Sequence, residues 1–175
     1  MTKNIDDIKK IIRDVNDFPK PGIIFKDITP LLLDPEAFDA VVTMLAEPFK
    51  NSGITKVAGM ESRGFIFGVP VAAKLNCGFI PVRKPGKLPA ETISESFELE
   101  YGTDSLEIHK DAAAKGDKIL IVDDLLATGG TAAATAKLIT RTGATVEAMT
   151  FVIELEFLNG KAALSNYNIK SLIKF

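Results

Sequence analysis

The sequence has very few of the side chains that hold redox groups and transition metals. It contains one cysteine, Cys77, one histidine, His109, and no tryptophan in 175 residues. A lone cysteine excludes an internal disulfide and favours a reducing compartment, so we expect a cytoplasmic protein. One histidine and one cysteine are too few for a His/Cys metal site, and any metal should therefore be bound through oxygen, as Mg²⁺ is.

Long apolar runs and an excess of charge of either sign are also missing. No stretch approaches the ~18 consecutive apolar residues of a membrane-spanning helix, and Met1–Asp7 is too polar for a signal peptide. A net charge of −2 argues against a nucleic-acid or anionic membrane surface. Hydrophobic residues make up 46% of the chain and charged residues 25%, which is ordinary for a folded protein. We expect a single domain, residues 1–175.

Predicted strands and helices alternate along the chain. Apolar runs rich in β-branched residues predict the strands, while apolar residues at helical spacing and the cap-like pair Asp34-Pro35 predict helices. The predicted strands are residues 54–59, 78–83, 118–122, 146–153 and 169–173, and the predicted helices are residues 5–12, 35–50, 65–74 and 132–138. This order predicts an α/β fold, a mainly parallel sheet flanked by helices, whose ligands bind beyond the carboxyl ends of the strands.

The most informative segment is Lys118–Thr131. An apolar strand, Ile119–Val122, leads to two adjacent carboxylates, Asp123 and Asp124, and then to a turn of small residues before a helix. Such a turn lets backbone N–H groups and the helix dipole bind a phosphate. The carboxylates suit hydroxyl groups or a divalent cation, so the implied ligand is a sugar phosphate with free hydroxyls. The segment has neither the P-loop pattern nor the dinucleotide glycine pattern.

A second predicted strand–helix turn, Glu61–Gly64, adds a cation. The planar guanidinium of Arg63 is suited to phosphate oxygens, and Gly64 relieves crowding of the backbone. The alternative is that Arg63 pairs with Glu61 on the surface.

A cluster of cations opens a long predicted surface loop, residues 83–96. Arg83, Lys84 and Lys87 would let this loop close as a lid over a polyanion, unless they simply form a solvated charged face. The loop leads into a predicted hairpin of residues 97–101 and 105–109. Glu100, within that hairpin, has no feature of its own that separates it from the other surface carboxylates.

Five segments together resemble a known family. The Val122–Thr131 segment resembles the phosphoribosyl-diphosphate motif of type I phosphoribosyltransferases. Four more segments resemble the adenine phosphoribosyltransferases, in the order and spacing of that family: Phe18–Leu32, Glu61–Phe65, Arg83–Pro89 and Leu99–Gly102. The resemblance implies a type I phosphoribosyltransferase core with a small hood, from residues 1–33 and 154–175, and a flexible lid loop of about residues 83–101.

The resemblance also implies a reaction and its participants. Adenine and 5-phosphoribosyl-1-diphosphate would give AMP and diphosphate, with Mg²⁺ as cofactor and a homodimer as the assembly. No protein ligand to the metal is implied directly. Mg²⁺ would be held through the diphosphate and the ribose hydroxyls, near Asp123 and Asp124.

Roles for single residues follow from the same resemblance. The 5′-phosphate would lie on Ala127, Thr128, Gly129, Gly130 and Thr131, and the ribose hydroxyls on Asp123 and Asp124. Diphosphate would be bound by Arg63, Lys84 and Lys87, of which Arg63 and Lys87 would also be catalytic. Phe25 and Leu158 would sandwich the purine, backbone groups near Lys26 would read its edge, Glu100 would be the catalytic acid at its imidazole edge, and Tyr101 would contact substrate. Asn159-Gly160-Lys161 departs from the family, which often has a basic residue, Gly and Arg there.

Two alternatives remain from the sequence. A phosphoribosyltransferase for guanine, xanthine or orotate would share the size and the core motif, although the hood segment and Glu100 favour adenine. A non-catalytic sensor of phosphoribosyl diphosphate would need a further domain for DNA or a partner. Since only 17 residues precede Phe18 and the chain is acidic, we expect an enzyme.

Overall fold

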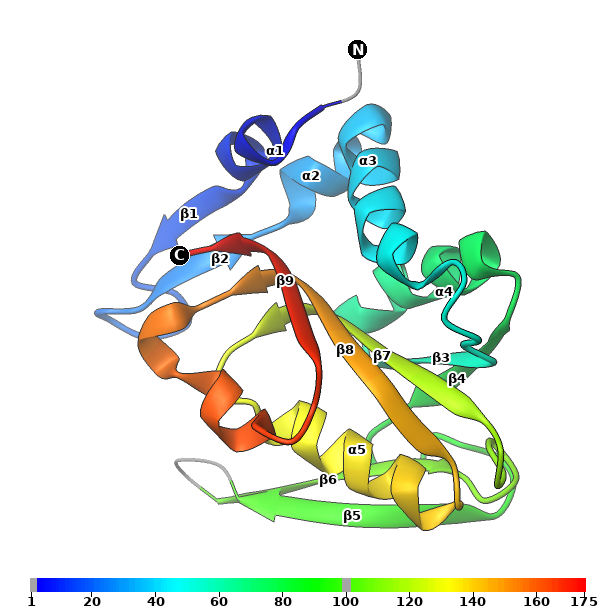
Figure 1. Ribbon diagram of the computed structural model, residues 1–175. Coiled ribbons are helices and arrows are strands. Elements are labelled where there is room, and N and C mark those ends of the chain that lie inside the picture. Colours follow the sequence, from blue (N-terminus) through cyan, green and yellow to red (C-terminus); the bar gives the residue numbers. More distant parts are fainter. Residues whose placement is uncertain (1–2, 99–101) are drawn as a thin grey trace. The chain divides into compact units, whose positions relative to one another are not determined.

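The computed structural model describes residues 3–98 and 102–175, and the chain divides into two compact units at residues 44 and 45. The first unit contains α1 (Ile5–Ile11), β1 (Arg13–Asn16), β2 (Ile24–Asp27), α2 (Thr29–Leu33) and most of α3 (Pro35–Ala46) (Figure 1). Ala37 donates its backbone N–H to Asp34 Oδ1 over 3.0 Å, which confirms Asp34 as the cap of α3. The helix predicted to reach Lys50 ends at Ala46 and continues as a 3₁₀ turn, η1 (Glu47–Phe49), which contains a proline.

The β1–β2 hairpin was not predicted from the sequence. Its register places Arg13 opposite Asp27 and Asp14 opposite Lys26. Both pairs are ion pairs: Arg13 Nε lies 3.0 Å from Asp27 Oδ2, and Lys26 Nζ lies 2.6 Å from Asp14 Oδ1. Cross-strand charge pairs of this kind fix the register of a short hairpin.

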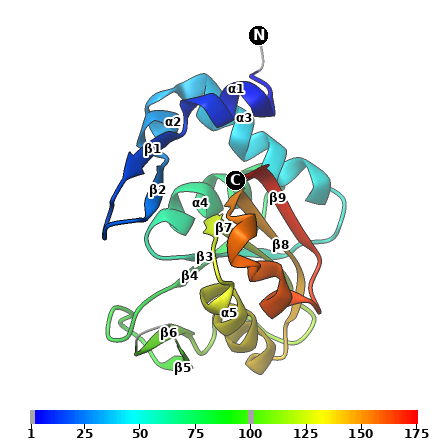
Figure 2. The ribbon, with the colours of Figure 1, turned by 90° about the vertical axis from the view of Figure 1, so that its left-hand side faces the viewer.

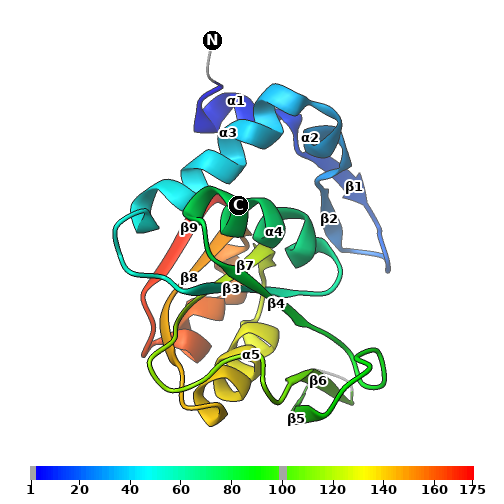
Figure 3. The same cartoon turned by 90° about the vertical axis from the view of Figure 1, so that its right-hand side faces the viewer.

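The second unit is built on a five-stranded parallel sheet with the strand order β4-β3-β7-β8-β9. Its strands are β3 (Lys56–Met60), β4 (Gly78–Val82), β7 (Lys118–Leu126), β8 (Thr145–Glu154) and β9 (Ile169–Lys174). Helices α4 (Arg63–Leu75) and α5 (Gly130–Arg141) lie on opposite faces of this sheet (Figures 2 and 3). Residues of β3, β7 and β8 on both faces are therefore buried, as the continuous apolar runs predicted.

An antiparallel hairpin, β5 (Thr92–Glu98) and β6 (Thr103–His109), packs beside α5. The prediction of a loop over residues 83–96 is therefore wrong for residues 92–96. The reason is side-chain packing, because Ile93 and Phe97 of β5 pack against the buried core that includes Leu106 and Ile108 of β6. Two short 3₁₀ segments, η2 (Glu156–Leu158) and η3 (Gly160–Leu164), connect β8 to β9.

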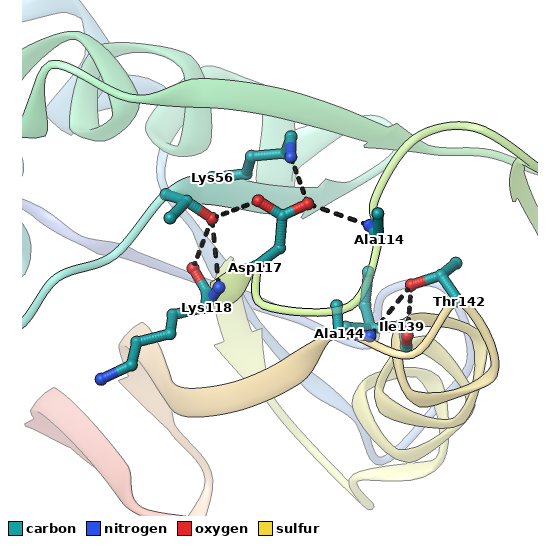
Figure 4. A network of polar contacts seen from close by, with 8 residues as sticks. Lys56, Ala114, Asp117, Lys118, Ile139, Thr142 and Ala144 are labelled. Atoms are coloured by element: carbon teal, nitrogen blue, oxygen red, sulfur yellow. Dashed lines mark hydrogen bonds and ion pairs between the residues drawn. The ribbon is translucent and has the colours of Figure 1, made fainter.

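A polar network closes the amino-terminal edge of the sheet around Asp117 (Figure 4). The Asp117 carboxylate is ion-paired with Lys56, accepts from Thr55 Oγ1 over 2.8 Å, and accepts from the Ala114 backbone N–H over 2.9 Å. These partners hold the pKa of Asp117 down at about 2. The network ties the start of β3 to the loop before β7, at the edge of the sheet away from the predicted ligand site.

Candidate active site

Two strand–helix turns meet at the carboxyl edge of the sheet. Strands β3 and β7 are parallel neighbours, with Gly59 opposite Val122, so the turns that follow them lie at the same edge. The first turn of α4 then approaches β7 so closely that a Cβ on Gly64 would lie 2.9 Å from Asp123 Oδ1 and 3.2 Å from the Val122 carbonyl oxygen. Any larger residue at position 64 would require the Asp123 side chain and the β7 backbone to shift. The two segments that the sequence predicted at this edge are in contact.

The carboxylates belong to the strand instead of following it. The strand predicted to end at Val122 continues to Leu126, and Asp123 is opposite Phe151 of β8. Helix α5 likewise begins at Gly130, two residues earlier than predicted. The charge at Asp123 marked a break in the apolar pattern, but pairing with β8 continues through it because the backbone hydrogen bonds do not depend on the side chains.

Arg63 pairs with Asp124. Its Nε lies 3.0 Å from Asp124 Oδ2, whereas the alternative pairing with Glu61 is not the one observed. The Asp124 side chain is only 4% exposed, and burial raises its pKa although the Arg63 charge opposes the rise. Burial, and then the charge of Asp124, raise the pKa of Asp123 well above its ordinary value. A buried carboxylate next to a partly buried one, with the Arg63 guanidinium nearby, favours further hydrogen-bond donors or a cation.

The small-residue turn forms a pocket of about 70 Å³, lined by Asp123, Leu125, Leu126, Ala127, Thr128, Gly129, Gly130, Thr131, Ala132 and Phe151. Gly129 is the amino-terminal cap of α5 and has a φ of +86°, a left-handed conformation that favours glycine. The backbone N–H groups of the first turn of α5 and the positive end of its dipole lie at the pocket, which is therefore suited to an anion.

Gly160 lies directly behind this turn, and it was not among the predicted site residues. A Cβ on Gly160 would lie 2.2 Å from the Ala127 carbonyl oxygen, and a Cβ on Gly129 would lie 2.6 Å from the Gly160 carbonyl oxygen. The backbone of the turn after β7 is therefore in direct contact with the backbone of η3. In this tail segment, which departs from the family pattern, the glycine is the residue that the contact requires.

The basic residues that open the loop are held by carboxylates. Arg83 Nε lies 2.7 Å from Glu61 Oε2, Lys87 Nζ lies 3.1 Å from Glu61 Oε1, and Lys84 Nζ lies 2.8 Å from Asp104 Oδ2. Burial tends to raise the pKa of Glu61, but the hydrogen bonds from Arg83 and the loop outweigh it and lower that pKa. Glu61 was not among the predicted site residues, because its partners are more than twenty residues away along the chain.

Five predicted site residues lie outside the described residues or are divided between the two units. Glu100 and Tyr101 lie outside the described residues. Phe25 and Lys26 are in β2 of the first unit, and Leu158, 37% exposed, ends η2 in the second. The purine sandwich of Phe25 and Leu158 therefore stays a prediction.

Residues 3–98 and 102–175 include no group of three or more histidine, cysteine, aspartate or glutamate side chains placed to hold a metal ion. Nor does this part of the chain have a helix with the length and apolar character needed to cross a membrane.

Comparison with known proteins identifies the family. The model of the phosphoribosyl transferase domain matches residues 30–171. The adenine phosphoribosyltransferase of Caldanaerobacter subterraneus subsp. tengcongensis is 57% identical over 171 residues, covering 98% of this chain and 99% of the relative. That of Francisella philomiragia subsp. philomiragia is 59% identical over 174 residues, with the same two coverages.

Solved structures agree with this similarity. The adenine phosphoribosyltransferase of Thermoanaerobacter pseudethanolicus superposes with a TM-score of 0.96 at 55% identity, covering 98% of this chain and 100% of the other. The Saccharomyces cerevisiae enzyme, in complex with an imino-altritol bisphosphate and adenine, gives a TM-score of 0.91 at 40% identity, covering 96% and 97%. The chain therefore belongs to the phosphoribosyl transferase domain family and, within it, to the adenine phosphoribosyltransferases.

Proposed function

We propose that the chain transfers the 5-phosphoribosyl group of 5-phosphoribosyl-1-diphosphate to adenine, giving AMP and diphosphate in purine salvage. The observation that carries this proposal is the contact between the two strand–helix turns, which puts an anion pocket, a carboxylate pair and Arg63 at one edge of the sheet. The relatives with more than half of their residues identical are named for this activity.

The 5′-phosphate lies in the turn of residues 127–131. Backbone N–H groups and the positive end of the α5 dipole neutralise it without a lysine, and the tight contact between Gly129 and Gly160 keeps the turn rigid. Asp123 and Asp124 accept hydrogen bonds from the ribose hydroxyls. Donors of this kind relieve the cost of placing the partly buried Asp123 beside the buried Asp124, and the raised pKa values of both carboxylates reflect that cost.

The leaving group is neutralised by cations of the chain. As diphosphate departs from the anomeric carbon, positive charge builds on the ribose and negative charge on the diphosphate. Arg63, Lys84 and Lys87 stabilise the negative charge where it develops. Mg²⁺, when bound through the diphosphate and the ribose hydroxyls, supplies further neutralisation. The oxygen-rich pair of Asp123, which lines the pocket, and the buried Asp124 fits such an ion, since Asp124 Oδ2 has no hydrogen-bond partner among the described residues and lies 3.0 Å from Arg63 Nε.

Adenine is held by the hood of residues 1–33 and 154–175, between Phe25 and Leu158, with backbone groups near Lys26 at its edge. Glu100 moves a proton at the imidazole edge so that N9 can attack, and Tyr101 contacts the substrate beside it. Closure of the loop before β5 excludes water, which would otherwise hydrolyse the activated sugar. We also propose a cytoplasmic homodimer, the assembly being measurable by light scattering.

The test is product formation from each free base with Mg²⁺ and phosphoribosyl diphosphate. Adenine should be consumed far faster than hypoxanthine, guanine or orotate. Comparable turnover of a 6-oxopurine would refute the specificity for adenine. Binding of phosphoribosyl diphosphate without turnover of any base would instead support a sensor.

A further inference from the structure

Glu61 is a buried carboxylate with no part in the proposed chemistry, yet it binds three donors of the basic loop. Its side chain is 8% exposed. Oε2 accepts from Arg83 Nε over 2.7 Å, while Oε1 accepts from the Lys84 backbone N–H over 3.0 Å and lies 3.1 Å from Lys87 Nζ. All three donors come from residues 83–87.

The contacts of Glu61 with Arg83 and with the Lys84 backbone N–H, at the start of the loop, are firm. Arg83 also exchanges both backbone hydrogen bonds with Glu107, at 2.9 and 2.7 Å, and its guanidinium carbon lies 5.9 Å from the centre of the Phe65 ring. The Arg83 side chain is 32% exposed. These partners hold Arg83 in place whether or not the rest of the loop moves.

The contact with Lys87 is the weak one. The Lys87 side chain is 50% exposed and shares Glu61 Oε1 with a backbone N–H that lies closer. An ion pair of a half-exposed lysine is worth little in water, so its partner is readily exchanged. Lys87 is also one of the cations that the proposed reaction needs at the diphosphate.

We propose that Glu61 is a positioning residue that holds the basic loop at rest by pairing with Lys87, until the substrate diphosphate takes Lys87 over. The inference rests on the proposed function, because that function puts diphosphate next to this loop. Carboxylate and diphosphate are both anions and compete for one ammonium group. Meanwhile the firm contacts of Arg83 and of the Lys84 backbone keep the loop ordered and near the site, which lowers the cost of ordering it on binding.

Because Glu61 and diphosphate compete for Lys87, removing the charge of Glu61 should strengthen the binding of diphosphate. Glu61→Gln keeps the shape and can still accept from the Lys84 N–H, but it gives up the charge that competes for Lys87. Inorganic diphosphate with Mg²⁺ should then bind about 2- to 5-fold more tightly, the factor expected from the loss of one exposed ion pair. A residue with only a structural role would weaken binding when replaced.

A double-mutant cycle tests this by calorimetry with inorganic diphosphate and Mg²⁺. The proteins are the wild type, Glu61→Gln, Lys87→Met and the double variant. The gain from Glu61→Gln should disappear in the Lys87→Met background, because the two residues act on each other. Glu91→Gln, which removes the same charge from an exposed residue paired with Lys110 at 3.4 Å, is the matched control and should leave binding unchanged.

Limited proteolysis gives a readout that needs no turnover. Without ligand, trypsin should cut the Lys87–Leu88 bond faster in Glu61→Gln than in the wild type. If Glu61→Gln does not fold, Glu61→Asp keeps the charge beside Arg83, shortens the reach to Lys87, and should change both readouts in the same direction.

Unchanged or weaker diphosphate binding in Glu61→Gln would overturn the proposal, as would an equal gain in the Lys87→Met background. The proposed function is tested separately. A failure to make AMP would refute that function, while faster cleavage at Lys87 would still support the resting contact. Absence of diphosphate binding in the wild type would overturn the exchange.

Discussion

Asp117 should be a strong contributor to stability, although it lies far from the proposed chemistry. Its carboxylate is 17% exposed and has three partners, Lys56, Thr55 and the Ala114 backbone N–H (Figure 4). They lower its pKa from 3.8 to about 2. A shift of this size corresponds to about 2 kcal/mol of folding free energy at neutral pH, since one pKa unit is worth about 1.4 kcal/mol.

The direction of the pKa shift decides the pH range in which Asp117 contributes to stability. Because the pKa is lower in the folded state, the contribution of Asp117 is complete above the unfolded value of 3.8 and is lost as the pH falls through about 2. By pH 3, about 1 kcal/mol of it should already be gone. Asp117→Asn should therefore reduce the free energy of unfolding by about 2 kcal/mol at pH 7 and by about half as much at pH 3.

Urea unfolding, followed by circular dichroism at the two pH values, measures both numbers. Asp111→Asn is the control, an exposed aspartate in the same segment, and it should change little. The reasoning fails if Asp117→Asn costs less than about 0.5 kcal/mol at pH 7, a typical surface effect. It also fails if the difference between the two proteins is the same at pH 3 as at pH 7.

Three further predictions concern the proposed active site. Gly129→Ala should lower both the melting temperature and the affinity for phosphoribosyl diphosphate, because its φ is +86° and its Cβ would meet a carbonyl oxygen at 2.6 Å. Gly130→Ala, whose Cβ would lie 3.4 Å from the Phe97 ring, should spare the melting temperature more; equal losses would contradict this. Lys87→Ala should lower kcat by roughly 10²-fold if its charge acts like one oxyanion-hole donor, and an unchanged kcat would mean a solvated charge. Glu100→Gln should lower kcat at near-normal phosphoribosyl-diphosphate binding, whereas equal losses from Glu98→Gln would point to general loop electrostatics.

Much of the fold could be predicted because the parallel sheet is buried on both faces. Runs such as Ile119–Val122 are apolar for that reason, and they mark the strands directly. The end of β7 was missed because Asp123 and Asp124 break the apolar pattern while the hydrogen bonding with β8 continues. Hydrophobic patterning reports burial, and it says little about where backbone pairing stops.

Residues 92–96, the first part of β5, were missed for a different reason, although the hairpin of β5 and β6 was predicted. The alternation of β5 places Ile93 and Phe97 on one face, but glutamates and serines occupy most of the remaining positions and make the segment look like a loop. A period-2 reading could have found it. The β1–β2 hairpin has weaker signals in the sequence, since its strands have only four residues each and prolines stand between them.

The candidate site was predictable where its parts are local. The turns after β3 and β7 each have their chemistry in a few consecutive residues, so the sequence located them. Glu61 and Gly160 have partners far along the chain, at Arg83 and Ala127, and no local pattern reports such contacts. The choice of Asp124 over Glu61 as the partner of Arg63 likewise depends on the tertiary approach of α4 to β7.

Because Gly160 contacts the backbone of residues 127–129, the affinity for a bound phosphate is coupled to the local stability of η3. Leu155 also donates its N–H to the Leu126 carbonyl oxygen over 3.0 Å, so the segment after β8 is bonded to the end of β7. If η3 opens, the wall behind the phosphate is lost. An anion that binds only the closed form therefore raises the free energy of opening η3, by about 2.7 kcal/mol at a concentration of 100 times Kd. Hydrogen exchange of residues 160–164 would then report how fully the phosphate pocket is occupied, from a segment that lies behind the pocket and not in its lining.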